Sequence, residues 1–202
     1  TPPIDKNTRL QKIIGVNEGV HPSLIAKAYE ILHKKGYQRV GNVMVVSGLS
    51  ASFSKDVDIY NREQMRQYMM LDEVSPYKTL IGVVKDGIYA ECFTISPEDF
   101  GITIDSQEIQ LVNTQEGLLA ANGKALAGLS DANSDYLAMN AAIGLFTAEY
   151  MDRKDAINPK GFNKDYLQEC FVRCRKAITS GQSAKHLEKI VAISNRGMEK
   201  QL

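Results

Sequence analysis

Two adjacent carboxylates are the residues of this chain best suited to chemistry. Asp72 and Glu73 stand side by side after the run Tyr-Met-Met-Leu, and a predicted strand begins shortly beyond them. Neighbouring carboxylates repel each other unless a positive charge, most often a metal ion, lies between them. From the spacing alone, a polar pair in a solvated loop is the commoner outcome, so the pair is a candidate metal site that needs further support.

Two further positions lie near the expected mouth of the sheet, where ligands usually bind in α/β folds. Gly48 closes a valine-rich run, and Ser75 follows the acidic pair. Both are candidate substrate-binding residues. Ser75 could contact a phosphate, although capping a turn before Pro76 is the commoner role for a serine at such a position.

The remaining polar candidates favour structural roles. His21 precedes Pro22 at an expected helix start, where a histidine usually caps the helix or a turn. His33 and His186 lie beside lysines in amphipathic helices and are expected to be surface residues. Asn140 lies within an apolar helix and needs a hydrogen-bond partner if buried, so we expect it to anchor that helix to a strand. We assign no catalytic residue.

The elements that must position these residues alternate between strand and helix. Residues 11–16 are predicted to form a short buried strand, and 21–36 a helix that begins near Pro22. Residues 40–48 have the pattern of a strand buried on both faces, typical of a mostly parallel sheet. Residues 77–95 then read as two antiparallel strands, because Asp86-Gly87 is a strong hairpin signal.

The second half of the chain is predicted to be helical. Apolar periodicity runs from Thr114 and then through 134–151, 162–181 and 183–194. Asn163 is expected to be an N-cap and Gly181 a C-terminal stop. The expected fold is α/β: a mostly parallel sheet with an antiparallel hairpin, covered by helices. The stretch 49–71 carries no clear pattern.

Composition sets outer limits on function. The 202 residues carry 24 basic and 24 acidic side chains, so net charge gives no support for broad attraction to nucleic acid. The three cysteines lack metal-ligand spacing, which favours a reducing cytoplasm. No apolar run approaches the ~20 residues that a bilayer-spanning helix needs, and no membrane partner is expected.

Several short strings together resemble a known family. They are IIGV, VMVVSG, LDEVSP, GVVKDGIYAECFTISPEDFGI and LAMNAA, in this order along the chain. Their succession resembles the C-terminal part of the glycosyltransferase family 3 enzymes, the family of the anthranilate phosphoribosyltransferases. The resemblance covers nearly the whole chain, and its most specific pieces are residues 72–75 and 94–102.

The resemblance implies a reaction and its partners. Enzymes of this family transfer a phosphoribosyl group from phosphoribosyl pyrophosphate to an acceptor, which is an aromatic amine, anthranilate, in tryptophan biosynthesis. By the resemblance, Asp72 and Glu73 correspond to the acidic pair that holds Mg²⁺ against the diphosphate. The implied partners are phosphoribosyl pyrophosphate, an aromatic acceptor, an N-terminal half of the same protein and, for the complete protein, a second copy in a homodimer.

The sequence also departs from the family pattern. The phosphate loop, usually Gly-Thr-Gly-Gly-Asp, and the helical domain belong to the N-terminal half of the family and are not found in residues 1–202. We therefore expect these residues to be inactive alone. The stretch ahead of Asp72 is longer than the compact turn usual in the family. Two alternatives stay open: a non-catalytic nucleic-acid-binding paralogue and a relative of the nucleoside phosphorylases.

Overall fold

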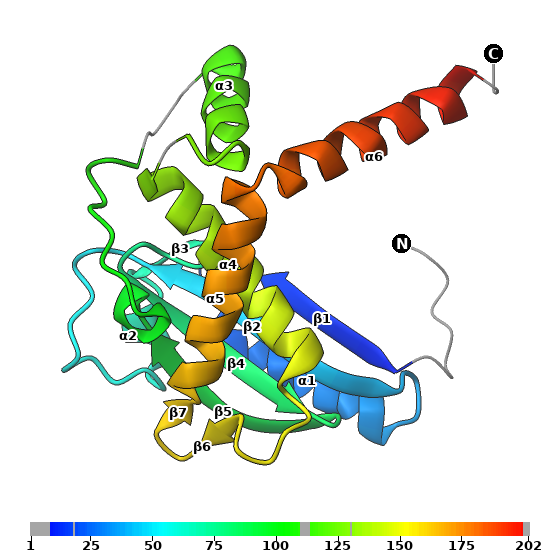
Figure 1. Ribbon diagram of the computed structural model, residues 1–202. Helices are drawn as coiled ribbons and strands as arrows, with labels where there is room; N and C mark the ends of the chain where they lie inside the picture. Colours follow the sequence, from blue (N-terminus) through cyan, green and yellow to red (C-terminus); the bar gives the residue numbers. More distant parts are fainter. Residues whose placement is uncertain (1–8, 18, 110–113, 130, 200–202) are drawn as a thin grey trace.

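A five-stranded sheet forms the centre of the molecule (Figure 1). The computed structural model describes residues 9–17, 19–109, 114–129 and 131–199. The strands run in the order β1-β2-β4-β5, and β3 pairs with β2. Their bounds are Leu10–Gly15 for β1, Val40–Leu49 for β2, Met69–Leu71 for β3, Lys78–Lys85 for β4 and Ile88–Ile95 for β5.

The expected α/β fold class is confirmed, and within it the sheet is mixed rather than mostly parallel. Only β1 and β2 are parallel, and they are joined through helix α1 (Pro22–Lys34). β4 runs antiparallel to β2. A parallel return would need a crossover helix, but the segment between β2 and β4 contains only the four-residue helix α2 (Arg62–Met65) and β3. The chain therefore re-enters the sheet from the end at which it left.

The hairpin between β4 and β5 is confirmed. Lys85 pairs with Ile88 across a two-residue turn, in which Asp86 has φ 50° and Gly87 has φ 77°. Two successive positive φ angles are the geometry that the Asp-Gly dipeptide favours in a tight hairpin.

The two faces of the sheet are covered by different helices (Figure 1). Every residue of β2 is buried, and Val43 and Val45 share a core cluster with Ala26 of α1. The alternate residues Met44 and Val46 belong to the larger core cluster on the opposite face. That face is packed by α4 (Asp131–Glu149), which in turn packs against α5 (Lys164–Thr179). The period-2 alternation of a buried strand explains the division.

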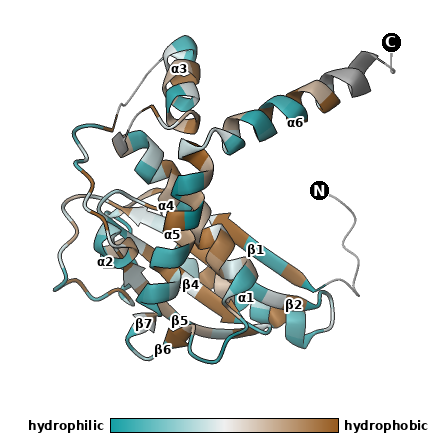
Figure 2. Cartoon of the chain, viewed as in Figure 1, coloured by the Kyte–Doolittle hydropathy of each residue, from teal (hydrophilic) through white to brown (hydrophobic). Residues whose placement is uncertain are grey.

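Of the C-terminal helices, α4 packs directly on the sheet, whereas α3 (Gln115–Leu126) and α6 (Gln182–Glu199) pack on other helices. α3 packs chiefly on α4, and α6 packs on α5 and α3. α6 extends away from the body, with hydrophilic and hydrophobic residues both along its length (Figure 2), and Leu187 and Ile190 are exposed. The expectation that all these helices cover the sheet therefore holds for α4 and not for α6.

The stretch 49–71 packs against the sheet rather than forming an open loop. Phe53, Met65 and Met69 are buried in a cluster with Leu80 of β4. β1, by contrast, was expected to be buried but is an edge strand with several exposed residues. The small pair β6 (Ile157–Asn158) and β7 (Gly161–Phe162) lies between α4 and α5 in the chain. Among the described helices, none has the length and apolar character needed to cross a membrane.

Candidate functional site at the carboxyl ends of β1 and β2

The acidic pair lies at the edge of the sheet where β1 and β2 end. β1 pairs with β2 as far as Val46. After Val46, β2 pairs with β3, beginning at Gly48. The chain leaves β3 through Asp72 and crosses the strand ends at very close range. A Cβ added at Gly15 would overlap the carbonyl oxygen of Asp72, and one at Gly48 would lie 2.7 Å from that of Glu73.

Helix α4 holds the acidic pair from the other side. The side-chain oxygen of Asn140 accepts a 2.8 Å hydrogen bond from the main-chain N–H of Val74, and its amide donates to the carbonyl of Tyr136. This confirms Asn140 as an anchor, although it holds the segment after the acidic pair. One turn earlier, the Tyr136 hydroxyl donates a 2.7 Å hydrogen bond to Oε1 of Glu73.

Tyr136 is the site residue that the sequence analysis missed. Burial raises the pKa of its hydroxyl first, and the hydrogen bond to Glu73 adds to the effect, so the group stays a neutral donor. Its position four residues before Asn140 was the available signal, because residues at this spacing share one face of a helix. Two polar residues on one face of an otherwise apolar helix indicate that this face contacts polar groups of another segment.

Both carboxylates of the pair are exposed. Within the described part of the chain, neither forms an ion pair, and no third aspartate, glutamate, histidine or cysteine joins them in a metal-binding group. Two carboxylates are the number that Mg²⁺ commonly takes from a protein when waters and substrate phosphates supply its other ligands. The donor set therefore fits Mg²⁺ shared with a phosphate group.

Two cavities open beside Glu73. One, of about 440 Å³, has mostly apolar walls that include Leu49, Met70 and Tyr77. The other, of about 410 Å³, lies under α3 and contains Asn122 and Asn140. Glu73 and Tyr136 line both cavities, so their hydrogen bond stands between an apolar and a more polar compartment.

The two predicted substrate-binding residues are built into this edge. Ser75 is fully buried, and its hydroxyl donates to the carbonyl of Leu49 while accepting from the N–H of Tyr77. Ser75 thus caps a turn, which was the commoner of the two roles considered for it in the sequence; the other was contact with a phosphate. Gly48 leaves room for the main chain of Glu73. A direct contact of either residue with substrate stays a prediction.

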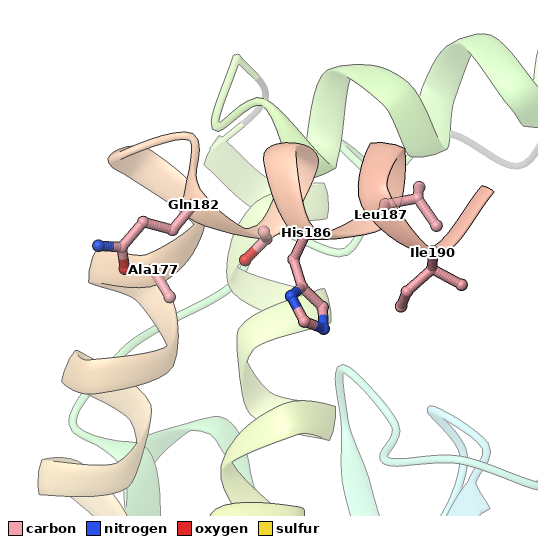
Figure 3. Close-up of a pocket in the computed structure, with 6 residues that line it drawn as sticks. Ala177, Gln182, His186, Leu187 and Ile190 are labelled. Carbon is pink, nitrogen blue, oxygen red and sulfur yellow. The ribbon is translucent and has the colours of Figure 1, made fainter. Parts of the chain in front are cut away.

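None of the three histidines lines the two cavities beside Glu73. His21 is the N-cap of α1, as expected, and is buried. His33 is not a plain surface residue: Nδ1 accepts a hydrogen bond from the N–H of Val40, and its ring lies where a Cβ of Gly87 would be. His186 is exposed on α6, beside a hollow of about 500 Å³ between α5 and α6 whose lining contains no acidic residue (Figure 3).

Comparison with known proteins finds anthranilate phosphoribosyltransferases among the relatives. The chain is 27% identical over 178 residues to an anthranilate phosphoribosyltransferase of Methylibium petroleiphilum, which covers 87% of the chain and 41% of the relative. It is 30% identical over 125 residues to that of a Polaromonas species, covering 61% of the chain and 32% of the relative. This chain is related to the anthranilate phosphoribosyltransferases. No family model matches it.

Solved anthranilate phosphoribosyltransferase structures share the fold. A variant of the Saccharomyces cerevisiae enzyme with Mg bound aligns with TM-score 0.53 at 19% identity, over 91% of this chain and 42% of that one. The yeast enzyme in complex with 4-fluoroanthranilate aligns with TM-score 0.54 at 20% identity, over 87% and 40%. The chain thus spans about two fifths of the length of these anthranilate phosphoribosyltransferases.

Proposed function

We propose that this chain forms the magnesium-binding side of a phosphoribosyltransferase site, which transfers a phosphoribosyl group from phosphoribosyl pyrophosphate to an aromatic amine such as anthranilate. The observation that carries the proposal is the exposed pair Asp72 and Glu73, held at the carboxyl ends of β1 and β2. The relatives named above support the reaction, and one solved yeast structure is a complex with phosphoribosyl pyrophosphate and Mg.

Each part of the site has a role in this proposal. Asp72 and Glu73 would hold Mg²⁺, which when bound neutralises charge on a departing diphosphate. Asn140 fixes the main chain behind the pair, so the carboxylates need little reorganisation. The apolar wall at Met70 and Tyr77 is suited to a planar aromatic acceptor beside Glu73.

We also propose that the rest of the site lies outside this stretch. The relatives are more than twice as long as the matched region, and residues 1–202 contain no Gly-Thr-Gly-Gly-Asp loop. The ribosyl group and the departing diphosphate must be positioned from several sides for transfer, so the acidic side alone should be nearly inert. An N-terminal half with the phosphate loop, a homodimer of the complete protein and a cytoplasmic location belong to the same proposal.

The test is a pyrophosphate-release assay, with anthranilate among several amine and nucleobase acceptors. We expect no turnover from the 202 residues alone and magnesium-dependent turnover when they are joined to the proposed N-terminal half. The double variant Asp72→Asn, Glu73→Gln should lower turnover by about a hundredfold or more, since it removes the charges that hold the ion. Added magnesium should restore part of the loss.

A matched control comes from α2. Glu63 is an exposed acid outside the candidate site, and Glu63→Gln should leave turnover unchanged. Robust turnover by the 202 residues alone, or an unaffected double variant, would place the chemistry elsewhere. Parallel reactions with phosphate and a nucleoside distinguish a phosphorylase from a transferase.

A further inference from the structure

Glu73 is the member of the acidic pair whose side chain has a specific hydrogen-bond partner. Its residue is exposed, yet Oε1 accepts a 2.7 Å hydrogen bond from the Tyr136 hydroxyl, which comes from a helix 63 positions further along the chain. Tyr136 is itself half-buried, and its main-chain carbonyl accepts from Asn140. The donor therefore stands on a rigid element that also holds the main chain of Val74.

An exposed glutamate without such a partner has no fixed direction. Its side chain rotates about three bonds, and the charge of the neighbouring Asp72 pushes it away. Tyr136 occupies one lone pair of Oε1 and leaves the other acceptor sites of the carboxylate open, because an ionised carboxylate has about four such sites. One hydrogen bond can thus orient Glu73 without blocking it.

We propose that Tyr136 is a positioning residue that holds the Glu73 carboxylate in its cation-binding orientation. The inference rests on the proposed function, which supplies the cation. Tyr136 does not touch the ion in this arrangement and acts through Glu73 alone. Partners that orient a metal-binding carboxylate commonly change metal affinity by 10- to 100-fold when they are removed.

A second effect of the same hydrogen bond opposes the first. A hydroxyl donor withdraws electron density from Glu73, so its removal makes the carboxylate a stronger ligand. The exposure of Glu73 decides between the effects: water replaces the lost hydrogen bond at an exposed oxygen, whereas water does not restore a fixed orientation. We therefore expect removal of the hydroxyl to weaken cation binding.

The experiment measures Mn²⁺ binding to the 202-residue chain by electron paramagnetic resonance, with Mn²⁺ alone and with inorganic pyrophosphate added. Tyr136→Phe should weaken Mn²⁺ binding about tenfold. The matched control is Tyr37→Phe, since Tyr37 is an exposed tyrosine before the amino end of β2, outside both cavities, whose hydroxyl has no partner among the described residues. This control should bind Mn²⁺ as the unaltered chain does.

A double-mutant cycle shows whether Tyr136 acts through Glu73. In a Glu73→Gln background, Tyr136→Phe should cause no further loss of Mn²⁺ affinity. A thermal midpoint measured for each variant separates loss of orientation from loss of folding, and Tyr136→Met provides a second variant without the hydroxyl.

The outcomes separate this inference from the proposed function. If the unaltered chain binds no Mn²⁺ even with pyrophosphate, the metal site itself is refuted and the inference with it. If the unaltered chain binds Mn²⁺ and Glu73→Gln weakens binding, but Tyr136→Phe binds equally well or more tightly, only the role of Tyr136 is overturned. A tenfold loss in Tyr136→Phe that persists in the Glu73→Gln background also overturns it.

Discussion

The side-chain oxygen of Asn140 on α4 lies 2.8 Å from the main-chain nitrogen of Val74, just behind the acidic pair. Val74 is 2% exposed, so water cannot easily take the place of Asn140. Because α4 also packs on β1 and β2, this hydrogen bond ties the edge of the sheet to the helix that covers it. The candidate site therefore depends on an interaction within the core.

Replacing Asn140 should lower the stability of the fold. Asn140→Ala leaves the buried N–H of Val74 without an acceptor, which costs about 1–3 kcal/mol in the free energy of unfolding. Urea unfolding followed by circular dichroism measures the change. Asn122→Ala is the matched control, because Asn122 is exposed on α3 and should tolerate alanine. Equal stabilities for the two variants would contradict the role given to Asn140.

Two glycine-to-alanine substitutions should have opposite effects. A Cβ at Gly15 would meet the carbonyl of Asp72, so Gly15→Ala must displace the acidic pair and should destabilise the fold by about 1–3 kcal/mol. A Cβ at Gly123, in the interior of α3, meets nothing within 4 Å, and alanine there should stabilise by up to about 1 kcal/mol. Thermal midpoints test both; a neutral Gly15→Ala would show that the acidic pair shifts without cost.

The stability of the fold should fall as the pH drops below about 6.5, the ordinary pKa of histidine. His21 Nε2 donates to the carbonyl of Ile59, so Nδ1 must be the neutral acceptor for the N–H of Ser23. Burial is the main cause that lowers the pKa of His21. The unfolded chain then binds a proton at a higher pH than the folded chain does, and stability is lost as pH falls through this range.

The variant His21→Asn tests this pH dependence. Asparagine is an effective N-cap that does not titrate. Its free energy of unfolding should change less between pH 7 and pH 5 than that of the unaltered chain, as urea unfolding at each pH would show. An identical pH dependence in both proteins would mean that His21 does not couple protonation to folding.

Local features of this chain were predictable from the sequence by itself. The start of α1 at Pro22, the tight turn at Asp86-Gly87 and the N-cap at Asn163 all appear where they were expected. These features depend on cap and turn chemistry that acts over a few residues. The valine-rich character of β2 likewise indicated a strand buried on both faces. The resemblance to a known family could also be found from the sequence, because it rests on short strings of adjacent residues.

Only the tertiary structure decided how distant segments meet. The pattern of β4 is the same for a parallel and an antiparallel neighbour, so the direction of β4 beside β2 depended on the packed path of residues 50–77. The meeting of Tyr136 with Glu73 required β3 and α4 to reach the same edge of the sheet. Such contacts arise from the packing of whole elements, and hydrophobic periodicity specifies which face of an element is buried but not which partner it meets.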